Sequence, residues 1–164
     1  MKSQQNPSDS AFVATSAKEA ALAKGGKLIL YALIIAFLGF LDATYLTILH
    51  YKNVIPPCTI GSCETVLTSE FSVIFGIPLA LLGSLFYLSV IVLGLLILTN
   101  YKKIFLNLFY VLAAWGFIFS LFLLGVQAFI LNAFCQYCLI SVATSTGIFI
   151  LAGINFWKTR KIPL

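Results

Sequence analysis

Four long apolar runs alternate with short polar segments along the chain. Each run holds at least about 20 mostly apolar residues, the length that an α-helix needs to cross a bilayer. None of the runs alternates polar and apolar residues as membrane-barrel strands do, so the pattern predicts helical spans. The predicted spans are residues 28–49, 74–99, 104–131 and 138–157. The third run is longer than a bilayer requires, which indicates a tilted helix or a protruding end.

The N-terminal segment differs in composition from these runs. Residues 1–10 are polar, and the stretch from Ala11 to Lys24 is rich in alanine. The pattern predicts a tail and then a short helix, which Gly25-Gly26 would end before the membrane. A cleaved signal peptide has an apolar core of about 7–15 residues, and the first run is longer, so an uncleaved span is favoured. We expect an N-terminal tail over 1–27, a membrane domain over 28–157 with an outer loop at about 50–73, and a C-terminal tail over 158–164.

Composition and charge support a membrane protein and suggest its orientation. Hydrophobic residues make up 61% of the chain and charged residues only 9%, whereas soluble domains carry about 25% charged residues. This excludes an ordinary water-soluble enzyme and a disordered chain. Nine of the ten basic residues lie in segments that four spans place on one side: Lys2, Lys18, Lys24, Lys27, Lys102, Lys103, Lys158, Arg160 and Lys161. The positive-inside rule makes that side cytoplasmic, and it accounts for the charge better than nucleic-acid binding does.

All four cysteines fall on the opposite, outer side, where disulfides persist. Cys58 and Cys63 lie in the outer loop, and Cys135 and Cys138 form Cys-Gln-Tyr-Cys at the start of the fourth span. Cysteines three residues apart at a helix start can reach disulfide geometry, and the helix N-terminus stabilises a thiolate. Cys138 would lie about 4.5 Å deeper than Cys135 along the helix. The pair can therefore meet a polar dithiol at one end and a lipid-soluble molecule at the other.

Other uses of the four thiols remain open at this point. They could form two structural disulfides in a non-catalytic membrane protein, bind zinc, or serve as buried apolar residues. Two pairs at one membrane face favour redox exchange over the structural alternative. A transporter or channel subunit would carry charged residues inside several spans, whereas Asp42 is the one charged residue inside a predicted span.

The segment Cys63–Gly83, with sequence CETVLTSEFSVIFGIPLALLG, resembles the vitamin K epoxide reductase family in its microbial form. The Cys-Gln-Tyr-Cys sequence also resembles the quinone-reacting motif of that family. The order of features is the same: a loop cysteine pair, a serine, Phe-Gly, and then Cys-x-x-Cys opening the last helix. The resemblance covers about residues 28–157.

The resemblance implies an all-α integral membrane protein, a four-helix bundle around a quinone site capped by the outer loop. Microbial members take electrons from a secreted thioredoxin-fold protein and pass them to a membrane quinone of the ubiquinone or menaquinone type. By motif position, Cys58 and Cys63 match the loop pair, Cys135 and Cys138 match the active-site pair, and Ser69 matches the serine near the active site. We expect a thiol:quinone oxidoreductase of the bacterial inner membrane that supports disulfide bond formation.

Two departures from the family pattern affect the expected quinone contacts. Animal members carry an asparagine shortly before Phe-Gly, at the position where this chain has Ser72. They also carry a tyrosine four residues past the last cysteine, where this chain has Val142. The fused thioredoxin-like domain of many microbial members would follow the fourth span, but the sequence stops at Leu164. The thioredoxin-fold partner is therefore expected to be a separate polypeptide.

The order of electron transfer is predicted from exposure and depth, and it agrees with what the resemblance implies. A reduced partner attacks the loop disulfide at Cys58, and the freed Cys63 attacks Cys135. Cys138 then leaves as a thiolate and passes electrons to the quinone. This relay requires the outer loop to fold over the start of the fourth span.

Several further polar residues have two interpretations each. Asp42 is either functional or bonded to a neighbouring Thr or Tyr near the outer end of its span. His50 is a proton carrier or an interfacial side chain beside Tyr51. The small polar residues Ser141, Thr144, Ser145, Thr146 and Gly147 serve helix packing or line a quinone site beneath Cys138.

Overall fold

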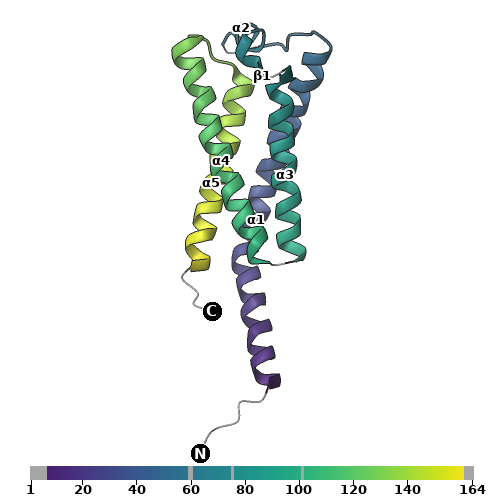
Figure 1. Ribbon diagram of the computed structural model, residues 1–164, viewed down its shortest axis with the longest axis vertical. Coiled ribbons are helices and arrows are strands. Elements are labelled where there is room, and N and C mark those ends of the chain that lie inside the picture. The colour runs from purple at the N-terminus through teal and green to yellow at the C-terminus, as the bar shows by residue number, and fades with distance from the viewer. Residues whose placement is uncertain (1–6, 59–60, 75, 101, 161–164) are drawn as a thin grey trace, which may run out of the picture.

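Four helices form an elongated bundle, shown in Figure 1 as a computed structural model. The structure describes residues 7–58, 61–74, 76–100 and 102–160. Within these residues, four helical segments are long and apolar enough to cross a membrane: Gly26–Tyr51, Leu79–Thr99, Lys103–Ile130 and Gln136–Thr159. The predicted number of spans and the all-α class are confirmed.

The first helix is longer than the sequence predicts. Helix α1 runs from Pro7 to Tyr51 without a break, so the predicted stop at Gly25-Gly26 is wrong. A glycine costs a helix only about 1 kcal/mol relative to alanine. The residues that follow form a packed face that includes Ile29 and Ala32, both almost fully buried. Tertiary packing of that face supports the helix through the two glycines.

The second span begins later than predicted. Strands β1 (Val73–Ile74) and β2 (Ile77–Pro78) pair antiparallel in a small hairpin, and helix α3 starts only at Leu79 and ends at Thr99. The predicted start at residue 74 is therefore wrong by about one helical turn. Pro78 is the reason, because a proline has no N–H to donate inside a helix but fits immediately before one.

The third and fourth long helices complete the bundle. Helix α4 (Lys103–Gly125) continues into a π-helical turn, η2 (Val126–Ile130), and α5 spans Gln136–Arg160. Helix α1 packs against α3 and α5, and α4 packs against α5 and α3. The core between them contains small residues beside large ones, such as Ala36 and Ala113 with Phe109. Small residues let helix backbones approach closely in a membrane.

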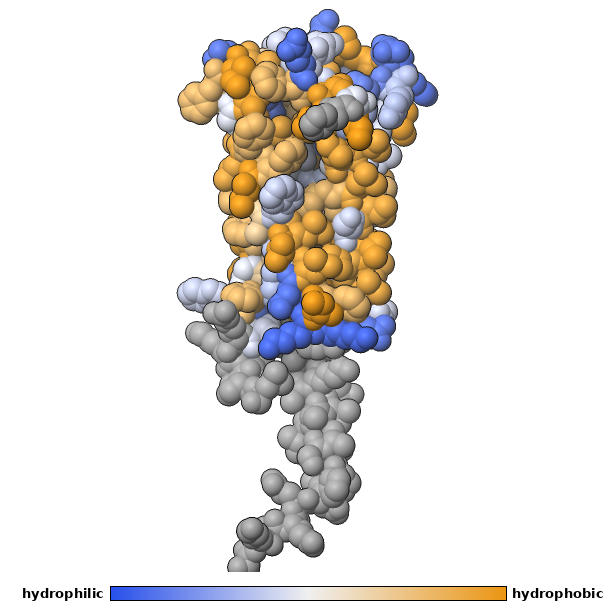
Figure 2. Space-filling view, in the orientation of Figure 1, coloured by the Kyte–Doolittle hydropathy of each residue, from blue (hydrophilic) through white to orange (hydrophobic). Residues whose placement is uncertain are grey.

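The two ends of the bundle differ. The described residues between 52 and 78 cover one end, which we call the capped end, and they include the short helix α2 (Cys63–Leu67), a 3₁₀ turn (Glu70–Ser72) and the hairpin. The start of α1 and the end of α5 lie toward the other end (Figure 1). Figure 2 shows an apolar belt across the visible face of the bundle, with polar residues concentrated above and below it. The belt is the surface expected of a membrane-embedded protein.

Candidate functional site

All four cysteines meet at the capped end. Cys58 and Cys63 form a disulfide whose Cα atoms are 6.1 Å apart, while Cys135 and Cys138 are free thiols. Cys63 and Cys135 are both fully buried in one small cluster, against which Cys58 and Cys138 pack. The structure thus places a disulfide beside a dithiol.

Backbone contacts hold the loop over the start of α5, as the predicted relay requires. Gly61 forms a β-bridge with Cys135, and the Ser62 N–H donates to the Phe134 carbonyl oxygen at 3.0 Å. The Tyr137 hydroxyl donates to the carbonyl oxygen of Pro57 at 3.1 Å. Gly61 has φ of 91°, and an added Cβ would collide with the Phe134 carbonyl, so only glycine fits this crossing.

The two free thiols have different surroundings. Cys135 has no exposed surface, and it immediately precedes the first turn of α5. A hydrogen bond from the Cys138 thiol lowers the pKa of Cys135 to about 7, and the N–H groups of Cys138 and Tyr137 act in the same direction against burial. The sequence predicts that this helix start stabilises a thiolate, and the lowered pKa is that of Cys135. Cys138 lies one turn further along and lines a cavity.

Gln127 is a site residue that the sequence analysis missed. It lies in the π-helical turn η2, and only 3% of its surface is exposed. Its Oε1 accepts a hydrogen bond from the Cys135 N–H at 3.1 Å, and its side chain also interacts with the Cys138 thiol. The signal in the sequence was an amide within the apolar run 104–131, which also contains Asn107. π-Helical turns occur frequently at functional sites, and here the turn carries the side chain that reaches both cysteines.

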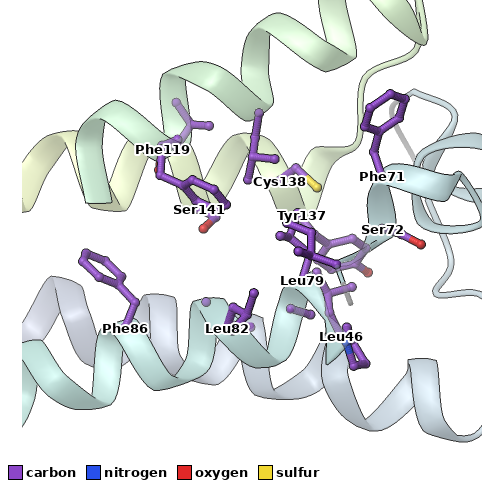
Figure 3. A pocket seen from close by; sticks show the side chains of 18 of the residues that line it. Leu46, Phe71, Ser72, Leu79, Leu82, Phe86, Phe119, Tyr137, Cys138 and Ser141 are labelled. Atoms are coloured by element: carbon purple, nitrogen blue, oxygen red, sulfur yellow. The ribbon is translucent and has the colours of Figure 1, made fainter. Parts of the chain in front are cut away.

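A cavity of about 580 Å³ opens beneath the cysteines, between the helices (Figure 3). This volume is within the range of small-molecule sites, and such sites are mostly apolar with a few polar groups. The lining follows that description, with Leu46, Leu79, Leu82, Phe86, Phe119 and Leu123 among its apolar members. In Figure 3, Cys138 points its sulfur into the space between the helices.

The serine and the two departures from the family pattern all lie in the cavity wall. Ser69 lines the cavity and donates its hydroxyl hydrogen to the Val66 carbonyl at 2.7 Å. Ser72 also lines it and donates to the Ser69 carbonyl. Val142 is a lining residue on α5. The cavity wall therefore contains the matched serine and both positions at which the chain departs from the family pattern.

A hydroxyl network occupies one part of the cavity wall. The Tyr87 hydroxyl donates to the Ser141 carbonyl oxygen at 3.0 Å, and its oxygen lies 2.7 Å from Thr144 Oγ1. Gly39 of α1 makes room for this tyrosine, because an added Cβ would lie 2.5 Å from the ring. Asp42 lines the same cavity, and its Oδ2 has no hydrogen-bond partner among the described residues.

The small polar face of α5 is divided between the cavity wall and helix packing. Ser141 lines the cavity, whereas Ser145 bonds to Ser120 of α4 at 2.7 Å and Gly147 lies against Ile35 of α1. His50 lines the cavity too, and its ring makes an edge contact with the neighbouring tyrosine, with centroids 6.1 Å apart.

The fold and the site define an integral membrane protein with a disulfide and a dithiol at the mouth of an apolar cavity. The vitamin K epoxide reductase family model matches residues 30–153, which is most of the chain, and the protein belongs to this family. It is accordingly a membrane oxidoreductase. No curated protein matches the chain at a significant level.

Proposed function

We propose that this protein is a thiol:quinone oxidoreductase that reoxidises the dithiol of a secreted thioredoxin-fold protein and reduces a membrane quinone. The observation that carries the proposal is the position of Cys138, a free thiol that lines the apolar cavity one turn from Cys135. The Cys58–Cys63 disulfide belongs to the same cluster and is a second redox pair within reach. Family membership supports the same class of chemistry.

The proposed relay moves two electrons from the partner to the cavity. The partner's thiolate attacks Cys58, and the released Cys63 attacks the Cys135–Cys138 disulfide at Cys135. Cys138 is the leaving thiolate. When the partner's second thiol completes its disulfide and Cys58–Cys63 re-forms, the two electrons reside on Cys135 and Cys138.

The cavity fits the head of a quinone as substrate. Its wall is mainly aliphatic and aromatic, which suits a lipid-soluble ring. The ring would take up two electrons and two protons as Cys135 and Cys138 close their disulfide. Ser69 and Cys138 line the cavity and are the proposed quinone contacts, for ubiquinone or a menaquinone-type ring.

The orientation belongs to the same proposal. The residues before 28 and after 157 are proposed to be cytoplasmic tails of a membrane domain in the bacterial inner membrane. The capped end would face the periplasm, where a secreted dithiol protein is available. Impermeant thiol labelling of reduced, intact cells should then modify Cys58. Labelling that occurs only in inverted vesicles would contradict this orientation.

The alternative function is a non-catalytic membrane protein with two structural disulfides. The position of Cys138 in the cavity wall favours the catalytic proposal, because a purely structural bridge does not need to face an apolar cavity. Purified protein should convert a short-chain quinone to quinol when a reduced thioredoxin-fold protein is supplied. Cys138→Ala should abolish the reaction, while Leu139→Ala, a change on an exposed side chain of the same turn, should leave it intact. No quinol from the unaltered protein would favour the structural alternative.

A further inference from the structure

Asp42 is a carboxyl group in the cavity wall without a bonding partner for one of its oxygens. Its Oδ2 is buried and makes no hydrogen bond within the described residues. The residues lining the cavity include no lysine or arginine to pair with it. A buried polar atom without a partner costs about 1–3 kcal/mol, and an acid inside a membrane span is a functional candidate by default. The cavity itself is where this oxygen can find a partner.

The Tyr87 hydroxyl differs from Asp42 Oδ2, because it already has hydrogen-bond partners in the cavity wall. Tyr87 has a single hydroxyl hydrogen, and its hydroxyl group already has three hydrogen-bond partners, the Ser141 carbonyl oxygen, Ser141 Oγ and Thr144 Oγ1. Asp42 lies close enough to act electrostatically on both Tyr87 and Cys138. Asp42 Oδ2 and the Cys138 thiol therefore lie in the same part of the cavity wall.

Quinone reduction requires protons at positions that the thiols cannot all reach. Closing the Cys135–Cys138 disulfide releases two electrons and two protons, and the quinone takes up both to become a hydroquinone. Cys135 has no exposed surface, and its sulfur is occupied by the hydrogen bond with Cys138. The two carbonyl oxygens of a quinone lie on opposite sides of its ring. A group other than the two thiols must therefore serve at least one of them.

We propose that Asp42 donates a proton to a carbonyl oxygen of the quinone as the ring is reduced. This inference rests on the proposed function. The carboxylate that remains accepts one of the two protons released by the dithiol, so Asp42 is unchanged over a full turnover. The overall reaction is balanced: dithiol and quinone give disulfide and hydroquinone.

The other titratable groups around the cavity identify the competing donors. They are His50 on α1, Tyr87 on α3, and Tyr137 and Cys138 on α5, with Cys135 just before that helix. Helix α4 and the turn η2 contribute no ionisable side chain to the lining. His50 stands eight residues after Asp42, about 12 Å nearer the capped end along α1. It is therefore a competing donor nearer the cavity mouth.

The test separates quinone reduction from thiol exchange in Asp42→Asn. Reduced protein is mixed with a short-chain quinone, and quinol formation is followed in a single turnover. We expect it to slow by about 10²–10⁴-fold, the range for loss of a general acid. Exchange of the same thiols with a small disulfide should keep its rate. Asp42→Glu should restore part of the quinone reaction, because it keeps the acid.

A matched control is available two positions away on the same helix. Thr44 Oγ1 is also buried without a hydrogen-bond partner, but Thr44 does not line the cavity. Thr44→Val should therefore leave quinol formation unchanged. The inference is overturned if Asp42→Asn reduces quinone at the normal rate, if it changes only KM, or if it slows thiol exchange equally. It is also overturned if only His50→Gln slows the reaction. Failure of the unaltered protein to form quinol would instead remove the proposed function.

Discussion

Replacing Gln127 by leucine should weaken the connection between the π-helical turn and the cysteine pair. Leucine is similar in size, so the change removes an amide without opening a large cavity. The Cys135 N–H, now bonded to Gln127 Oε1 at 3.1 Å, would lose its acceptor in a site that has no exposed surface. An unsatisfied buried donor costs about 1–3 kcal/mol. That range corresponds to a shift of about 5- to 150-fold in the unfolding equilibrium.

Reversible unfolding in mixed micelles measures this loss. Asn107→Leu is a matched control, since it removes an exposed amide from α4, the helix that continues into the turn carrying Gln127. We expect Gln127→Leu to be destabilised and to reduce quinone more slowly, because Cys138 also loses the side chain it interacts with. Equal stability of Gln127→Leu and the unaltered protein would refute the argument that this hydrogen bond holds the cysteine turn.

Three further outcomes test the cysteine relay. Cys58→Ala should stop electron transfer from the protein partner while quinone reduction by a small dithiol continues, and equal loss in both assays would contradict a relay through the loop. Cys138→Ala should accumulate a Cys63–Cys135 disulfide, because the Cys135 thiolate attacks the Cys58–Cys63 bridge at Cys63 and releases Cys58 as a thiol. Non-reducing digestion and mass spectrometry detect this bond, and an intact Cys58–Cys63 bridge there would show that the relay order is wrong. Exchange of the reduced pair with a small disulfide should accelerate as pH rises and level off above about 7, because the Cys138 thiol lowers the pKa of Cys135. A rate that keeps rising beyond pH of about 8.5, the ordinary thiol value, would contradict the hydrogen bond.

The sequence predicted the spans and the meeting of the cysteines because both depend on long-range patterns. Apolar length identifies four spans, and alternation of sides then places loop and helix cysteines at one end. The helix boundaries were predicted less well, because local residue preferences compete there with tertiary packing. Tertiary packing outweighed Gly25-Gly26, and the missing N–H of Pro78 delayed α3 until Leu79.

The pattern of apolar and polar residues did not reveal every residue of the site. Gln127 reaches the cysteines because a π-helical turn ends α4, and no periodicity of apolar residues indicates such a turn. The surroundings of Asp42 could be described only with the neighbouring helices in place. Its Oδ2 has no hydrogen-bond partner among the described residues, although Thr44 and Tyr45 are close in sequence. Proximity along the chain was therefore a poor guide to the hydrogen bonds of this oxygen.

The Cys58–Cys63 bridge joins residues only five positions apart, and this short spacing limits what its opening does to the fold. In the chain-entropy account, a loop of this length stabilises a protein by only about 2 kcal/mol, less than a bridge between distant segments. The cap also has attachments that do not involve sulfur, at Gly61 and at Pro57. In the proposed relay, such a bridge can therefore open and close in every turnover while hydrogen bonds keep the capped end in place. The bond proposed to exchange electrons would then be different from the bonds that hold the cap.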